Sequence, residues 1–255
     1  MLSAGGCGTG AFWSHIPFNR AHCIDDAHLR VMFLQRLDCL RFPDGLSCAM
    51  PKADKDVTAD PERCGQPMDA RGLHLHNCPV GTRRFRPHNS VVAKLGRLLK
   101  LSGAHVDLER SCPELYREHV EPDGSRRVRE AVLDVVALFS GSCMQRKIDV
   151  TIRSPFSQAC MNARTVRPGL AASNGEKAKA SRYGNTVLPL SFESLGRLGP
   201  GSLETITALR MDARMLGRAF FSATGSVCDW RRQLETVLLY ELADAALLCM
   251  GRCGR

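Results

Sequence analysis

The run AVLDVVALF at residues 131–139, followed beyond the turn SGS at 140–142 by KIDVTI at 147–152, decides the fold. Both runs are short, apolar and rich in β-branched residues, which is typical of the two strands of a β-hairpin. Each contains one acidic residue, Asp134 in the first and Asp149 in the second, and fourteen residues separate them. An unpaired charge inside an apolar strand is costly, so we expect these carboxylates to serve a purpose.

Two adjacent strands that each present one carboxylate at the same level form a minimal site for a hard cation beside a phosphate. The alternative is that both carboxylates face solvent from alternate strand positions. Further side chains that could complete such a site follow in the sequence: Glu176, Lys177, Lys179, Arg182, Tyr183 and Glu193. Their ordinary roles would be solvated helix lysines, an aromatic ring at the core edge and a helix cap.

Patterns along the rest of the chain indicate an α/β protein with a mixed central sheet flanked by helices. Residues 110–125 show little periodicity and are expected to form a loop. Helices are expected after Asp25, where Leu29, Met32, Phe33 and Leu37 would bury one face, and at about 89–101, 175–183, 202–222 and 227–250; strands are expected at 104–109 and 186–192, beside the hairpin at 127–153. We divide the chain into a helical connector at 1–50, a Cys/His segment at 51–82, an α/β core at 83–200 and a helical pair at 201–255.

The composition favours an acidic partner and a reducing compartment. The chain of 255 residues carries a formal net charge of +9, which favours a polyanion, although such values also occur in proteins that bind none. Its 12 cysteines are scattered rather than grouped as a disulfide framework, and residues 1–6 lack the features of a secretory signal. No apolar stretch approaches the roughly 20 residues that span a bilayer, so no membrane association is expected.

A compact Cys/His segment suggests a zinc site. Cys64, His74 and Cys78 have the spacing C-x9-H-x3-C, in which a turn can return the second and third ligands to the first. A tetrahedral site needs a fourth ligand from outside this pattern. Cys48 is the natural candidate, with His76 or Glu62 as alternatives, and the ordinary interpretation is a loop with incidental Cys and His residues.

These motifs, taken in order, resemble the carboxy-terminal region of site-specific non-LTR retrotransposon proteins, which carry a Cys/His zinc knuckle before a restriction-like endonuclease of the PD-(D/E)XK superfamily. The resemblance covers most of the chain. Its residues are Cys64, Gly65, Asp69, Gly72, His74 and Cys78 for the knuckle, His88 and Asn89 for the first nuclease helix, Leu133-Asp134-Val135 and Ile148-Asp149-Val150-Thr151 for the acidic strands, and Glu176, Lys179, Arg182 and Tyr183 for a basic-tyrosine helix. The segment at 189–199, which contains Glu193, resembles the following strand and turn.

Two departures from the family pattern bear on the site. Leu133 stands where the family has proline, which leaves the metal-binding aspartate unchanged. Thr151 stands where many members of the superfamily carry a lysine, and in the retrotransposon branch that lysine has moved to the later helix. Lys179 fits the role best, with Lys177 as the alternative.

The resemblance implies a fold, a reaction and a set of roles. It implies a restriction-endonuclease-like sheet in which Asp134, Asp149 and the carbonyl of Val150 bind Mg²⁺ or Mn²⁺, Lys179 or Lys177 stabilises the transition state, and Tyr183 and Glu193 support them. Zinc would be structural. The DNA backbone would be bound by basic residues around the first nuclease helix, namely Arg83, Arg84, Arg86, His88, Lys94 and Arg97.

We therefore expect a nuclear, metal-dependent DNA endonuclease without the reverse transcriptase of such elements, with DNA and possibly element RNA as partners. The localisation follows from the resemblance; without it, the composition indicates only an intracellular protein. The alternative is a catalytically decayed remnant of the same element that binds nucleic acid or has a structural role.

Overall fold

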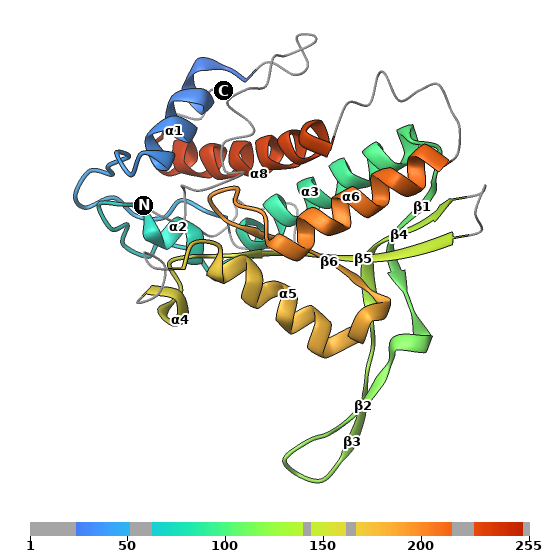
Figure 1. The fold of residues 1–255 in the computed structure, drawn as a ribbon. Helices are drawn as coiled ribbons and strands as arrows, with labels where there is room; N and C mark the ends of the chain where they lie inside the picture. Colours follow the sequence, from blue (N-terminus) through green and yellow to red (C-terminus); the bar gives the residue numbers. More distant parts are fainter. Residues whose placement is uncertain (1–23, 52–62, 140–143, 162–166, 216–226, 252–255) are drawn as a thin grey trace, which may run out of the picture.

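A mixed four-stranded sheet lies at the centre of the structure, a computed structural model (Figure 1). Its strand order is β1 (His105–Ser111), β4 (Val132–Phe139), β5 (Met144–Arg153) and β6 (Leu188–Glu193). The pairs β1/β4 and β4/β5 are antiparallel, and β5/β6 is parallel. The expected mixed α/β sheet and its central acidic hairpin are therefore confirmed. The structure describes residues 24–51, 63–139, 144–161, 167–215 and 227–251.

Helices cover both faces of this sheet (Figure 1). On one face lie α3 (Gly81–Leu101), α6 (Pro200–Met215) and α8 (Val227–Cys249), and α5 (Leu170–Tyr183) lies on the other. The remaining helical segments are α1 (Asp26–Arg36), which packs on α8, the short α2 (Leu73–Asn77) and α4 (Gln158–Met161), and the 3-10 turns η3 (Pro113–Leu115) and η4 (Gly184–Thr186). Helix α3 begins eight residues before the expected start at Asn89 and contains Pro87.

Alternating strand residues feed two apolar clusters. Val135, Ala137 and Phe139 of β4 belong to the main core with helices α3, α6 and α8. Val136 belongs to a smaller cluster that includes Tyr183 of α5. From Val135 to Phe139 this alternation is the period of two that a strand covered on both faces requires, whereas Leu133 also joins the smaller cluster.

The first helix occurs where expected, but its buried face differs. Val31 and Met32 are buried, whereas Leu29, Phe33 and Leu37 are 40%, 47% and 44% exposed. The apolar spacing alone could not show which side of the helix packs against α8. Among the described helices, none combines the length and apolarity needed to cross a membrane.

One element was not expected from the sequence. Residues 110–125 were predicted to be a loop, but β2 (Arg117–Val120) and β3 (Arg126–Arg129) pair as an antiparallel hairpin that projects from the body (Figure 1). Every residue of these two strands is exposed. With no core face, the strands lack the apolar alternation by which a strand is recognised.

The Cys/His segment shares the main core with the sheet and helices. Cys48, Met50, Leu75 and Cys78 belong to the same buried cluster as residues of α3, α8 and the sheet. The segment is therefore packed as part of one body.

Candidate metal centres

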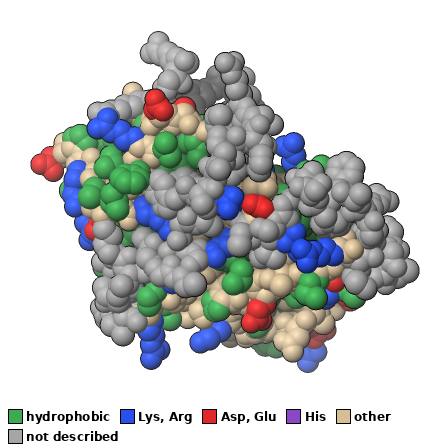
Figure 2. All heavy atoms as spheres, turned by 45° about the horizontal axis from the view of Figure 1, so that its top comes forward, with side chains coloured by type: hydrophobic (Ala, Val, Ile, Leu, Met, Phe, Trp, Pro, Cys, Tyr) green, Lys and Arg blue, Asp and Glu red, His purple; other side chains and the backbone are tan. Residues whose placement is uncertain are grey.

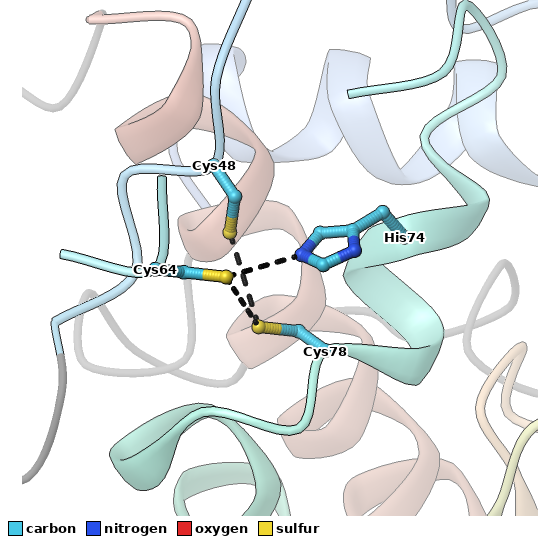
Figure 3. A group of neighbouring side chains, drawn as sticks. All are labelled: Cys48, Cys64, His74 and Cys78. Carbon is cyan, nitrogen blue, oxygen red and sulfur yellow. Dashed lines mark hydrogen bonds between the residues drawn. The ribbon is translucent and has the colours of Figure 1, made fainter. Parts of the chain in front are cut away.

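Four side chains form a Cys/His cluster at one end of the molecule. Cys48, Cys64, His74 and Cys78 offer ligand atoms that all lie within 4.8 Å of one another. Figure 3 shows them converging on one point. This group could bind a metal ion such as zinc, and Cys48 is the fourth member as expected.

Main-chain pairing brings the first two thiols together. Cys48 donates its N–H to Gln66, and Gly65 donates back to the carbonyl of Cys48, which joins the two loop segments as a short ladder. Gly65 has a positive φ of 68°, a conformation that glycine adopts without strain. Cys48 lies before position 51, where we placed the start of the Cys/His segment.

Asp69 orients the helix that carries His74. Its carboxylate accepts the N–H groups of Arg71, Leu73 and His74 at 3.0, 3.0 and 2.9 Å. Burial acts to raise the pKa of Asp69, but these three donors outweigh it and hold the pKa below its usual value. The carboxylate therefore caps α2, in the way that side-chain oxygens satisfy the first N–H groups of a helix.

The distances within the cluster match a tetrahedral ion. The Cys48–Cys78 and Cys64–Cys78 sulfur atoms are 3.9 and 3.7 Å apart, and the Cys64 sulfur is 3.5 Å from His74 Nε2. Ordinary Zn–S and Zn–N bonds in a tetrahedron place two sulfurs about 3.8 Å apart and a sulfur and a nitrogen about 3.6 Å apart. Burial lowers the pKa of His74, which favours the neutral imidazole that metal binding needs.

Of the alternative fourth ligands, His76 faces elsewhere and Glu62 lies outside the described residues. His76 Nδ1 is 2.9 Å from Ser194 Oγ, and its ring packs against Phe156. His76 therefore connects α2 to the loop after β6.

The two aspartates of the acidic hairpin form a second centre. The register of β4 and β5 ends at Val135 opposite Ile148, so Asp134 and Asp149 occupy the next opposing positions. There the Asp134 carboxylate accepts the N–H of Val150 at 2.6 Å. Each carboxyl group perturbs the pKa of the other, as expected for neighbours on the same side of the sheet.

The surroundings of the two carboxyl groups shift their pKa values in opposite directions. Asp149 is 4% exposed, and its burial together with the Asp134 carboxyl raises its pKa to about 6. Burial also acts to raise the pKa of Asp134, but hydrogen bonds from His88 and Val150 keep it below its usual value. Two carboxylates this close cannot both ionise without a compensating charge.

Helix α5 supplies a cation and a phenol to this centre. Lys179 Nζ donates to Asp149 Oδ2 at 2.7 Å, and the lysine side chain is 19% exposed. Burial and the Asp149 carboxylate raise the pKa of Tyr183 to about 12. Lys177, the alternative lysine, is exposed on the same helix. The close approach of α5 depends on Gly175, since a Cβ there would lie 2.4 Å from Ser191 Oγ and 2.8 Å from Thr151 Cγ2.

His88 also belongs to this centre, although we expected it to contact DNA. Its Nε2 lies 3.3 Å from Asp134 Oδ2, and its Nδ1 lies 3.1 Å from Asn89 Oδ1. Burial acts to lower the pKa of His88, but the hydrogen bond and charge of Asp134, together with the hydrogen bond to Asn89, outweigh burial and raise it. The imidazole therefore holds Asp134 from the side of α3.

The structure places two further acidic candidates at helix ends instead. Glu193 Oε1 accepts the N–H of Ala171 at the start of α5. In the β5/β6 register, Glu193 is four positions beyond the partner of Asp149, which is roughly 13 Å along the strand. Glu176 Oε1 accepts both the N–H and the hydroxyl of Ser202 in the first turn of α6. Both carboxylates act as helix caps, so the expected supporting role of Glu193 at the aspartates is not what its contacts show.

Of the six residues expected to bind DNA, the four whose side chains the structure describes lie in different environments. Arg86 pairs with Glu241 and Asp244 of α8 at 3.4 and 3.2 Å, and Lys94 is half-buried, which lowers its pKa. Arg97 is exposed on α3, whereas the side chains of Arg83 and Arg84 lie outside the described part of the structure. Figure 2 shows that Lys and Arg side chains are scattered over the face turned forward there.

The basic hairpin and the role of His88 were missed from the sequence. The Asp-Gly pair at 123–124, between REHV and RRVR, is a turn signal that could have revealed the hairpin. No comparable signal links His88 to Asp134, because their contact depends on how α3 packs on the sheet. No protein-family model matches this chain, and no curated protein shows significant similarity to it.

Proposed function

We propose that this chain is a metal-dependent DNA endonuclease with a restriction-endonuclease-like core, related to the nuclease of site-specific non-LTR retrotransposons. The observation that carries the proposal is the meeting of Asp134, Asp149 and Lys179, which come from two strands and a helix. Paired carboxylates beside a lysine are the groups that phosphodiester hydrolysis with a hard cation requires. The sequence motifs support the proposal independently, because they select the same three residues.

The carboxylate pair suits Mg²⁺ or Mn²⁺. Such ions are commonly held by one or two carboxylates, with water and substrate phosphate as the other ligands. Burial and then the neighbouring Asp134 carboxyl raise the pKa of Asp149, and a bound divalent cation would stabilise its ionised form. When bound, the ion would lower the pKa of a water molecule and offset the charge on the phosphoryl oxygens.

The surrounding side chains would prepare the site. Lys179 would leave Asp149 and place its ammonium group beside a nonbridging phosphate oxygen, where negative charge increases in the transition state. His88 would keep the Asp134 carboxylate aimed at the cation. Tyr183, with its raised pKa, would remain a neutral hydrogen-bond donor at Asp149.

The Cys/His cluster would hold zinc and serve stability. Its four protein ligands fill a tetrahedron and leave no position for a substrate, which is the mark of a structural site. It ties the loop around Cys48 and Cys64 to α2 and so fixes the end of the molecule next to α8.

One observation favours the alternative of a noncatalytic DNA-binding remnant. Lys179 pairs with Asp149, and Val150 and His88 contact the Asp134 carboxylate, so the protein itself supplies partners to both groups. The pair could therefore persist as a buried polar network after activity has been lost.

A plasmid-nicking assay with Mg²⁺ or Mn²⁺ separates the two functions. We expect the wild-type chain to nick supercoiled plasmid and Asp134→Ala and Asp149→Ala to abolish nicking. Asp107→Ala is the matched control, because Asp107 is a half-exposed carboxylate on the neighbouring strand β1 and pairs there with Arg110. No nicking by the wild type, or equal nicking by all three variants, would reject the endonuclease. Salt-sensitive DNA binding without nicking would favour the remnant.

A further inference from the structure

The projecting β2–β3 hairpin has one basic face. Its register sets Arg117 opposite Arg129 and His119 opposite Arg127. Alternate residues of a strand point to the same side, so these four side chains share one face. The other face carries the pairs Glu118–Val128 and Val120–Arg126. The pairing register of β2 and β3 therefore places these basic side chains together on one face.

The charge of this face is not balanced by the protein. The side chains of Arg127, Arg129 and His119 form no hydrogen bond or ion pair with any residue in the described ranges. By contrast, Arg126 on the other face pairs with Glu118 at 3.5 Å. Like charges directly opposite each other destabilise an antiparallel pair. A phosphate backbone would convert this unfavourable arrangement into a favourable one.

The hairpin is attached to the proposed catalytic centre at two points. Arg117 Nη1 donates to the carbonyl of Ser181 at 3.3 Å, and Arg182 Nη2 donates to the carbonyl of Glu130 at 3.1 Å. Both contacts are made by the last turns of α5, the helix that carries Lys179. Five residues lead from Arg129 to Asp134, so their Cα atoms are at most about 18 Å apart.

We propose that the basic face of this hairpin, formed by Arg117, His119, Arg127 and Arg129, binds the phosphate backbone of a DNA duplex beside the Asp134–Asp149 centre. The turn at its tip contains Glu121 and Asp123, which would repel phosphates. The hairpin therefore lies along the duplex and does not enter a groove tip first. This inference deepens the proposed function and shares its ligand, but it is decided by binding alone.

The test measures binding of the full chain to a fluorescent DNA duplex by anisotropy without divalent cations, across a salt series of about 50 to 200 mM. The variant Arg127→Gln/Arg129→Gln removes two charges from the basic face. The control Arg126→Gln/Lys100→Gln removes two exposed charges elsewhere, one of them from the opposite face of the same strand. Thermal melting of each variant checks that it is folded.

We expect the basic-face variant to bind about tenfold more weakly and to reduce the salt slope by about 1.8, since each phosphate contact contributes about 0.9. The control should stay within about twofold of wild type, with an unchanged slope. Equal losses in both variants would assign the effect to net charge and overturn the proposal. Wild-type affinity in the basic-face variant would also overturn the proposal and would indicate that this face binds a protein partner instead. Binding that depends on the hairpin in a chain that does not nick would support this inference and reject the endonuclease.

Discussion

The two candidate centres of this protein differ in the partners of their ligand atoms. In the Cys/His cluster, four soft ligands converge on one point at distances that suit a tetrahedral ion. In the aspartate centre, two hard ligands are already engaged by Lys179, His88 and a main-chain N–H. The difference teaches that a metal would complete the first centre, whereas at the second it would have to displace internal partners. A site whose four positions are all filled by protein ligands suits a structural ion. A site whose ligands can exchange partners suits an ion that must also bind substrate.

The largest expected effect is on catalysis at the aspartate centre. Lys179→Ala should lower the nicking rate by about 100-fold or more, because it removes the cation beside the phosphate. Lys177→Ala is the matched control from the same helix and should change the rate less than about twofold, because that lysine is exposed. Rates of plasmid nicking at saturating Mg²⁺ measure both. A greater loss in Lys177→Ala would transfer the catalytic role to that residue.

The next effect is on stability at the Cys/His cluster. Cys78→Ser should release the metal and lower the free energy of unfolding by about 4 kcal/mol or more, since a structural ion contributes directly to folding. Cys39→Ser, at an exposed cysteine remote from the cluster, should retain one zinc per chain. Metal analysis and denaturant unfolding provide the two readouts. Full stability of the Cys78 variant without metal would mean that the cluster is only a group of buried thiols.

A smaller effect tests how tightly the metal-bearing loop is packed. Gly72 has φ of 66°, and a Cβ there would lie 2.3 Å from Phe42 Cε2. Gly124 has φ of 80° but open space around it. Gly72→Ala should therefore destabilise the protein by about 1–3 kcal/mol more than Gly124→Ala, because only the first adds a clash to the backbone strain. Equal melting temperatures for the two variants would contradict the packing of α2 against Phe42.

The smallest expected effect is a pH dependence of stability at the aspartate centre. The folded pKa of Asp149, about 6, exceeds its unfolded value of about 3.9, so the native state retains a proton that the unfolded state releases. This contribution is complete below pH ~4 and is lost as the pH rises through about 6. Thermal unfolding without divalent cations should show a shallower fall in stability for Asp149→Asn over this range. Identical profiles for the two proteins would mean that the carboxyl is not perturbed.

Much of the fold could be predicted because its elements have buried faces. The hairpin of β4 and β5, the strands β1 and β6 and the final helices all carry apolar patterns that match their environment. The β2–β3 hairpin escaped prediction because it buries no side chains. The connector helix α1 was predicted, but its exposed Leu29 and Phe33 show that periodicity does not reveal which neighbour covers a face.

The sequence predicted those site residues whose type and position already indicate a chemical role. A carboxylate within an apolar strand indicates a partner, and the spacing of Lys179 and Tyr183 on α5 placed both on the side that reaches Asp149. Glu193 was predicted to support the site, with a helix cap as the alternative. Its carboxylate accepts the main-chain N–H of Ala171, a contact that tertiary packing alone determines.

The close contact at Gly175 has a consequence for where this protein can keep its lysine. Two neighbours prevent a side chain at position 175, namely Ser191 on β6 and Thr151 on β5. A long side chain at 151 would occupy the space in which α5 rests, and α5 delivers Lys179 one turn after Gly175. In this chain, a short residue at position 151 and a glycine at position 175 therefore act together, because both are needed for α5 to bring Lys179 to Asp149.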